Sequence, residues 1–366
     1  MSAPMQFGLY CPQQSITVGS REIVRSTAAA MAPLRDGEVD PACAIATEVL
    51  VAADAAGFDI ILFAERHLGP DLEAWLMASA IGSRTKRIRN MVAVHPGLWH
   101  PALIAKMAVS LDRICPGRMA INLVTGWNEV EHRMFGGSHM PDNDDRYVRA
   151  EEYIEILRGT WSASPFSYRG RFYQLDQVEL MLRPATPTPP DIFTASRSER
   201  GLDMVAKYAD WWFLDFPKTV QNAQDVTDSL RRAIADMDAR AARHGRKVRY
   251  GFNPYLAFGP SEEAAMQSTL DALMATDPDA DGRKIKSRVA PALKAGCIGP
   301  AEAIREQLMK YHDMGVELFL LKFVPTIEEV GRIRDEIIAP LRRDPLPVPP
   351  PLAGKGGVET KLKEAV

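Results

Sequence analysis

Cysteine is scarce in this chain of 366 residues, which contains four. The four cysteines lie far apart, and none belongs to a Cys-x-x-Cys pair or to a Cys/His ligand spacing. In a chain of this size, such a distribution is typical of free thiols in a reducing compartment and not of a disulfide framework. We therefore expect free cysteines, no zinc site and no other metal site.

An excess of one charge is also missing. The chain has 44 Lys and Arg against 47 Asp and Glu, and its formal net charge of −3 is not accompanied by a long basic run. This balance argues against nucleic acid as a partner, because contacts to phosphates need a basic surface. A content of 46% hydrophobic and 25% charged residues is typical of a globular protein.

Long apolar runs and glycine-rich phosphate loops are absent as well. No uninterrupted apolar stretch reaches the length of a membrane span, and the first residues show no basic segment followed by an apolar core. We therefore expect a cytoplasmic protein with no membrane partner. The first expected strand is followed by Tyr10-Cys-Pro-Gln-Gln14, which does not favour a doubly wound, nucleotide-binding sheet.

The chain does contain short apolar runs that alternate with helical segments. The apolar runs are rich in β-branched residues, as in strands that are buried on both faces. The expected strands are 6–10, 58–63, 88–94, 118–124, 191–195, 211–214, 248–258 and 317–323. Eight strands alternating with helices indicate an α/β fold, a (β/α)8 TIM barrel that forms a single domain over residues 1–343. The Pro- and Gly-rich segment 344–366 is expected to be a tail.

Polar residues follow several of these strands. In a barrel, the carboxyl ends of the strands meet at one mouth, where barrel enzymes carry their chemistry. The polar and aromatic residues expected to converge there are Glu65, Arg66, His67, His95, Trp99, Asn122, Thr125, Trp127, Asn253 and Tyr255. The sequence therefore predicts a ligand site at this mouth.

Several short motifs point to one family. Asn122-Leu-Val-Thr-Gly-Trp127 is followed by Glu131, and the motifs Gly57-Phe-Asp59, Asp145-Arg-Tyr147 and Gly170-Arg-Phe-Tyr173 occur in the matching order. In this order and spacing, the chain resembles the bacterial-luciferase-like flavin monooxygenases over nearly its whole length. The resemblance is to the branch that holds the alkanesulfonate, dimethyl sulfone and pyrimidine monooxygenases.

The resemblance implies a fold, a cofactor and partners. Such proteins are (β/α)8 barrels that take reduced FMN (FMNH2) from a separate NAD(P)H-dependent flavin reductase and react it with O2. The absence of a nucleotide-binding fingerprint agrees with an external electron supply. The resemblance also implies a homodimer or homotetramer, and we expect segment 277–297 to act as a lid that excludes water.

The resemblance also implies roles for individual residues. It places the flavin ring against Glu65 and Arg66, and it assigns contacts with the ring edge or ribityl chain to Asn122, Thr125 and Glu131. The phosphate would be held by Arg146, Tyr147 and Ser198, the last of which precedes an expected helix. The implied contacts to substrate or peroxide are His67, His95, Trp99, Asn253 and Tyr255. Plain structural roles stay open for the two histidines, for Trp99 and for the first-turn pair Arg146 and Tyr147.

The chain departs from the alkanesulfonate enzymes at several positions, and one of these departures bears directly on the substrate. They carry an Arg-x-His pair where this chain has Asn253 and Tyr255, so a fixed guanidinium clamp for a sulfonate is missing. Asn253 suits a neutral sulfone better, although Arg66, Lys322 or the lysine-rich lid can still bind an anion. We expect an FMNH2-dependent monooxygenase that oxygenates a small sulfone or sulfonate with C–S cleavage. The alternatives are a pyrimidine ring-opening monooxygenase, a deazaflavin-dependent dehydrogenase and a catalytically silent flavin-binding protein.

Overall fold

The computed structural model describes most of the chain. The described residues are 3–12, 32–68, 71–126, 128–136, 142–216, 220–274, 293–323 and 326–342. Trp127, nearly all of the expected lid and the expected tail lie outside them. Within the described residues, no helix has both the length and the apolar character needed to cross a membrane. Cys11, Cys43, Cys115 and Cys297 are all free thiols.

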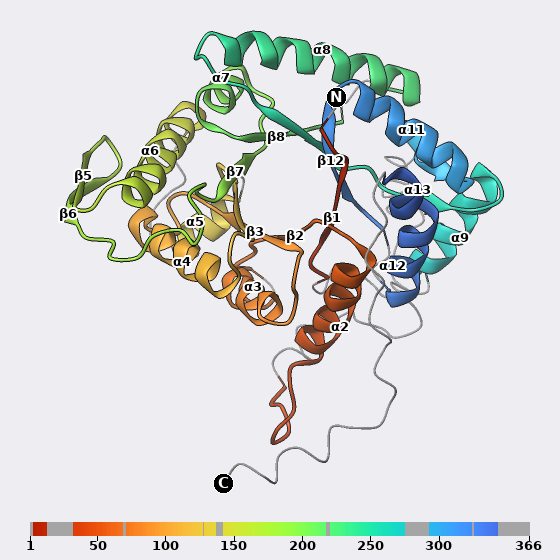
Figure 1. Ribbon diagram of the computed structural model, residues 1–366, viewed down its shortest axis with the longest axis horizontal. Coiled ribbons are helices and arrows are strands. Elements are labelled where there is room, and N and C mark those ends of the chain that lie inside the picture. Colours follow the sequence, from red (N-terminus) through yellow and green to blue (C-terminus); the bar gives the residue numbers. More distant parts are fainter. Residues whose placement is uncertain are drawn as a thin grey trace.

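The centre of the molecule is a closed barrel of eight parallel strands (Figure 1). These are β1 (Gln6–Tyr10), β2 (Ile60–Phe63), β3 (Arg89–Val94), β4 (Met119–Leu123), β7 (Asp191–Thr194), β8 (Trp211–Leu214), β9 (Arg249–Phe252) and β12 (Val316–Leu321). They pair in the order β1-β12-β9-β8-β7-β4-β3-β2, which closes between β2 and β1. The predicted (β/α)8 barrel is confirmed.

Helices surround this barrel as an outer ring (Figure 1). They are α2 (Pro41–Ala56), α3 (Ala74–Gly82), α4 (Pro101–Ile114), α6 (Asn143–Ser162), α7 (Glu199–Tyr208), α8 (Ala223–Ala242), α9 (Glu262–Met274), α11 (Ala301–Asp313) and α12 (Ile327–Ile333), the last continued by a π-helical turn (Arg334–Ile338) and α13 (Ala339–Leu341). Helix α2 ends at Gly57, which adopts the left-handed conformation with φ of 90°, as is usual for a glycine that follows a helix. The strands β5 (Phe166–Arg169) and β6 (Gln174–Val178) form a short antiparallel pair outside the barrel.

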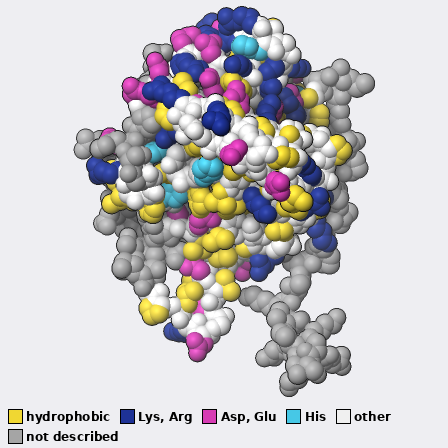
Figure 2. All heavy atoms as spheres, turned by 90° about the vertical axis from the view of Figure 1, so that its left-hand side faces the viewer, with side chains coloured by type: hydrophobic (Ala, Val, Ile, Leu, Met, Phe, Trp, Pro, Cys, Tyr) yellow, Lys and Arg dark blue, Asp and Glu magenta, His cyan; other side chains and the backbone are white. Residues whose placement is uncertain are grey.

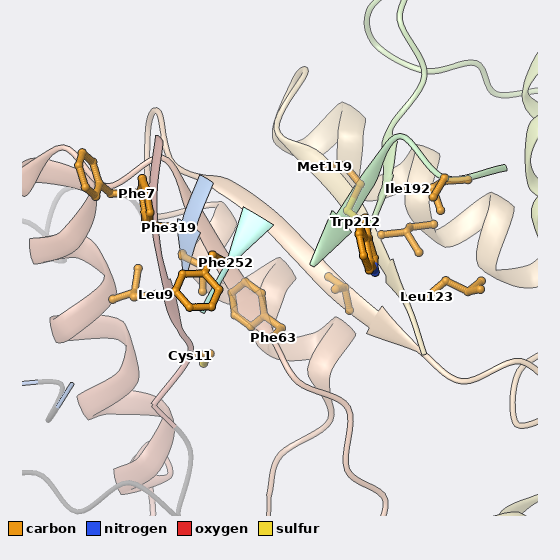
Figure 3. Close-up of a cluster of buried hydrophobic side chains, with 14 of the residues drawn as sticks. Phe7, Leu9, Cys11, Phe63, Met119, Leu123, Ile192, Trp212, Phe252 and Phe319 are labelled. Atoms are coloured by element: carbon orange, nitrogen blue, oxygen red, sulfur yellow. The ribbon is translucent and has the colours of Figure 1, made fainter. Parts of the chain in front are cut away.

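Alternation along the strands creates two apolar layers. In β12, Leu318 and Leu320 face the barrel interior, whereas Phe319 and Leu321 face the helices. The interior is a packed plug in which the ring of Phe193 stacks on Trp211 with centroids 5.0 Å apart. Figure 3 shows part of the outer layer, including Phe7, Phe63, Trp212 and Phe252. The next inward-facing positions along each strand therefore lie above the plug, at the mouth.

The outer surface carries charges of both signs. On the face shown in Figure 2, charged side chains crowd the end formed by α8, and hydrophobic side chains gather lower down. Arg240 of α8 ties that helix to α7 by ion pairs with Glu199 at 2.6 Å and Asp203 at 2.7 Å. This mixed surface agrees with the balanced charge of the sequence.

The structure differs from the sequence prediction at one strand and at one short helix. The expected strand 248–258 is wrong in extent: β9 ends at Phe252, and β10 (Ala257–Phe258) pairs with β11 (Ile298–Gly299) in a separate small sheet. Pro254 explains the break, because proline has no N–H to donate to a central ladder. The sequence also gave no sign of the short helix α5 (Glu129–Phe135), which Asn128 caps by accepting from the N–H groups of Val130 and Glu131.

Candidate active site

A buried carboxylate, Glu65, organises one arc of the mouth. Its side chain follows β2, and the residue is 6% exposed. Oε2 accepts the backbone N–H of His95 at 2.9 Å, and Oε1 accepts the indole N–H of Trp99. His67 Nε2 lies 3.2 Å from Oε1. Because a buried charge needs compensation by such partners, Glu65 fixes the positions of all three residues.

A second carboxylate, Glu131, approaches from α5. It is 4% exposed, and its Oε1 accepts the backbone N–H groups of His67 and Leu68, both at 3.3 Å. The Nδ1 of His95 lies 3.9 Å from an oxygen of Glu65 and 3.9 Å from an oxygen of Glu131. The helix that the sequence did not predict is therefore what brings the second carboxylate to the histidine.

The two histidines have opposite protonation tendencies. The pKa of His67 is raised above its usual value, first by its hydrogen-bonding contact with Glu65. The pKa of His95 is lowered, first by burial, although both carboxylates oppose that shift. Their ring centroids are 6.2 Å apart. The surroundings therefore favour the charged form of His67 and the neutral form of His95.

The same residues have the composition of a metal site. One candidate ligand atom each from Glu65, His67 and His95 lies within 4.8 Å of the others. However, both oxygens of Glu65 already accept hydrogen bonds from His95 and Trp99, which accounts for the arrangement without an ion. The expected absence of a metal therefore stays a prediction.

A second group of side chains lies where α7 begins. The Oγ of Ser198 donates to the hydroxyl of Tyr147 at 2.9 Å, and that hydroxyl is 3.1 Å from Oγ of Ser196. Ser198 also caps α7 by accepting from the N–H of Gly201. We call Tyr147, Ser196, Ser198 and the first N–H groups of α7 the anion seat, because hydroxyls and a helix N-terminus favour a negative group.

Ser196 was not among the predicted site residues. Its only sequence signal is its place two residues before the predicted phosphate contact Ser198, in the turn Ala195-Ser-Arg-Ser198. A Cβ on Gly201 would lie 1.7 Å from Ser196 Oγ, so the close approach of α7 to this hydroxyl requires glycine. Arg197 of the same turn is paired with Asp215. Arg146 precedes Tyr147 on α6 and donates to the carbonyl of Gly126 at 2.7 Å.

Polar side chains from β1, β9 and β12 form a third group. The Asn253 amide donates to the hydroxyl of Tyr10 at 3.3 Å, and Lys322 Nζ lies 5.6 Å from the centroid of the Tyr10 ring. Tyr255 forms a β-bridge with Lys322. Neither Tyr10 nor Lys322 was among the predicted site residues, although Lys322 was noted as a possible anion contact.

The remaining predicted residues lie between these groups. Asn122 is in line with Ala120 and Val124 on the interior face of β4, and it is only partly buried. Within the described residues, the side chains of Asn122 and Thr125 make no hydrogen bond, so both can serve a ligand. Arg66 is exposed beside Glu65.

A closed (β/α)8 barrel with an anion seat and an imidazole–carboxylate cluster at its mouth has the design of a barrel enzyme that holds a phosphorylated group. Residues 5–318 match the family model described as luciferase-like monooxygenase, and the chain belongs to that family. It is 30% identical over 321 residues to an FMNH2-dependent dimethylsulfone monooxygenase of Pseudomonas fluorescens (strain Pf0-1), covering 80% of this chain and 85% of the relative.

Solved structures share the fold at lower identity. A long-chain alkane monooxygenase superposes with a TM-score of 0.72 at 17% identity, covering 94% of each chain. An F420-dependent secondary alcohol dehydrogenase superposes with a TM-score of 0.66 at 15% identity, covering 93% of this chain and 100% of the other. The barrel alone therefore does not separate flavin from deazaflavin chemistry.

Proposed function

We propose that this chain is an FMNH2-dependent monooxygenase that uses O2 to oxygenate a small sulfone or sulfonate, with cleavage of a C–S bond. The observation that carries the proposal is the similarity over 321 residues to a dimethylsulfone monooxygenase. A separate NAD(P)H-dependent flavin reductase, a cytoplasmic location and a homodimeric or homotetrameric state belong to the same proposal.

The described residues fit FMN. The anion seat supplies hydroxyls and a helix N-terminus for the phosphate, and Arg146 next to Tyr147 on α6 adds a positive charge on the same helix. The amide of Asn122 and the hydroxyl of Thr125, which have no hydrogen-bond partner among the described residues, suit the polar edge of the ring or the ribityl chain, and Glu131 of α5 is assigned to the same part of the flavin. Reduced flavin, when bound, supplies the electrons that activate O2.

The chain's own residues then supply positioning and proton control. Glu65 holds Trp99 and both histidines, which form one wall of the substrate space next to Arg66. His67, with its raised pKa, can donate a proton to a developing oxyanion, whereas the buried His95 accepts one. Asn253 and Tyr255 offer hydrogen bonds to the substrate from the other arc.

The test supplies chemically reduced FMN and isotopically labelled O2 to the purified protein. The panel contains dimethyl sulfone, methanesulfonate and uracil, and products are followed by mass spectrometry. We expect label in a product of a sulfur compound. Labelled uracil products would favour the pyrimidine ring-opening alternative, and hydrogen peroxide alone across the panel would overturn the proposal. A parallel titration with FMN and a deazaflavin separates the monooxygenase from the dehydrogenase. Turnover in the product assay separates it from the silent flavin-binding protein, which would bind flavin and form no product.

A further inference from the structure

Lys322 stands at the mouth of the barrel, at the end of β12. Leu318 and Leu320 of the same strand face the barrel interior, so alternation directs Lys322 to the inner side, above the plug. Tyr10 reaches the same level from β1, where it packs on the interior cluster. Asn253 follows the end of β9 and touches Tyr10. Because β1, β12 and β9 are neighbours in the barrel, these three side chains form one compact group.

The charge of Lys322 has no counter-ion within the described part of the chain. Its ammonium group lies over the face of the Tyr10 ring, with Nζ 5.6 Å from the ring centroid. The nearby carboxylate of Asp215 is engaged in its own ion pair with Arg197. Burial by the surrounding protein lowers the pKa of Lys322, and Asp215 opposes that shift. The side chain is nevertheless exposed to the opening, so its ammonium group can meet a ligand that enters the mouth.

The neighbours of Lys322 have unused hydrogen-bonding capacity. The NH2 group of Asn253 has two N–H donors and gives one of them to Tyr10, which leaves the second for a ligand. The Tyr10 hydroxyl accepts from the Asn253 amide, which leaves its own proton to donate. An ammonium, a hydroxyl donor and an amide suit a small group with several oxygens. Lysine acts as a point charge on a single oxygen and does not require the two-oxygen geometry of an arginine fork.

We propose that Lys322, Tyr10 and Asn253 form the subsite that binds the sulfonyl oxygens of the substrate, with Lys322 as the residue that favours anionic sulfonyl compounds over neutral sulfones. The choice of sulfonyl chemistry rests on the function proposed above. A sulfone and a sulfonate both present S–O oxygens, but only the sulfonate brings a charge that the ammonium can neutralise. The preference for a sulfonate over a sulfone then depends on Lys322 at the end of β12, and not on an arginine at the end of β9.

The test measures binding by calorimetry on protein loaded with oxidised FMN. Methanesulfonate and dimethyl sulfone are titrated into wild type, Lys322→Met, Lys322→Arg and the control Lys310→Met. Lys310 is exposed on α11, so its substitution removes the same charge away from the mouth. We expect Lys322→Met to weaken methanesulfonate binding roughly tenfold or more, and dimethyl sulfone binding by only about threefold. Lys322→Arg should recover part of the methanesulfonate affinity, and FMN affinity should stay within about twofold in every variant, as for a folded protein.

The outcomes separate this subsite from the catalytic proposal. Methanesulfonate affinity within about twofold of wild type in Lys322→Met, an equal loss in Lys310→Met, or no binding of either sulfonyl compound to wild type would each overturn the subsite. Formation of labelled product is scored independently. A wild type that binds methanesulfonate through Lys322 but yields no oxygenated product supports the subsite and refutes the monooxygenase function.

Discussion

The Nε2 atom of His67 lies 3.2 Å from Oε1 of Glu65, although the two residues are separated by a single position in the sequence. The backbone N–H of His67 is meanwhile bound by Glu131 from α5. The side chain and the backbone of His67 are thus held by two carboxylates, one that follows β2 and one on α5.

This contact predicts a pH dependence. The pKa of His67 is raised in the folded protein, so the associated stability is present below the ordinary histidine pKa and is lost as pH rises through the raised value. Activity that needs the imidazolium should fall over the same range. Glu65→Gln should lower the pKa of His67, measured by NMR titration of the imidazole. The exposed Glu302→Gln on α11 is the control, and an unchanged His67 titration in Glu65→Gln would refute the contact.

The buried His132 predicts that stability changes with pH in the opposite direction under acidic conditions. It is 1% exposed, both ring nitrogens lack hydrogen-bond partners, and burial together with Arg149 lowers its pKa to about 4. The folded protein then binds fewer protons than the unfolded chain, so stability should fall as pH drops from the ordinary histidine pKa towards 4. His132→Phe should flatten part of this slope in urea unfolding curves recorded across that range. Equal slopes in both proteins would contradict the assignment.

The anion seat predicts a ligand-specific loss. Tyr147→Phe removes the hydroxyl shared by Ser196 and Ser198, and it should weaken FMN binding about two- to tenfold. Riboflavin, which lacks the phosphate, should bind Tyr147→Phe as it binds wild type. Fluorescence titration of both proteins with FMN and with riboflavin gives the dissociation constants to be compared. Equal losses for FMN and riboflavin would mean that the hydroxyl supports the ring or the fold and not the phosphate.

The interior plug predicts a large loss of stability. Phe193 is fully buried and its ring contacts Trp211 and Phe213, with centroids 5.0 and 5.6 Å away. Phe193→Ala should lower the free energy of unfolding by about 3–5 kcal/mol, because the rings above and below cannot close the cavity. Met181→Ala, at a side chain that is 84% exposed, should change it by less than about 0.5 kcal/mol. Chemical denaturation measures both, and similar losses would refute the plug's role.

Local patterns in the sequence were enough to predict the barrel, but they were not enough to predict the geometry of the site. Strand and helix periodicity, with stops such as Gly57, predicted the order of elements. Helix α5 was missed because it has only seven residues and its stability comes from the Asn128 cap and from Glu131 binding to the loop after β2. A contact across 64 positions leaves no mark in local periodicity.

The site residues show the same limit. Motif resemblance singled out Tyr147 and Ser198, and the structure brings their hydroxyls together. It passed over Ser196, whose role depends on how closely Gly201 of α7 approaches. Lys322 was predicted only as one of several residues that could bind an anion. Its lack of a counter-ion among the described residues follows from how the ends of β1, β9 and β12 lie together, which local sequence does not show.

The break at Pro254 has a consequence for redesign. The Lys322 N–H donates to the carbonyl of Pro254 at 2.9 Å, and the N–H of Leu256 donates to the carbonyl of Lys322 at 2.8 Å. Residues 253–256 and Lys322 are therefore joined by backbone hydrogen bonds into one unit, although residues 257–321 lie between them in the sequence. To transfer the substrate preference of a relative, both segments must be exchanged together. Either segment alone would have to form these backbone hydrogen bonds with a segment whose conformation suits a different partner.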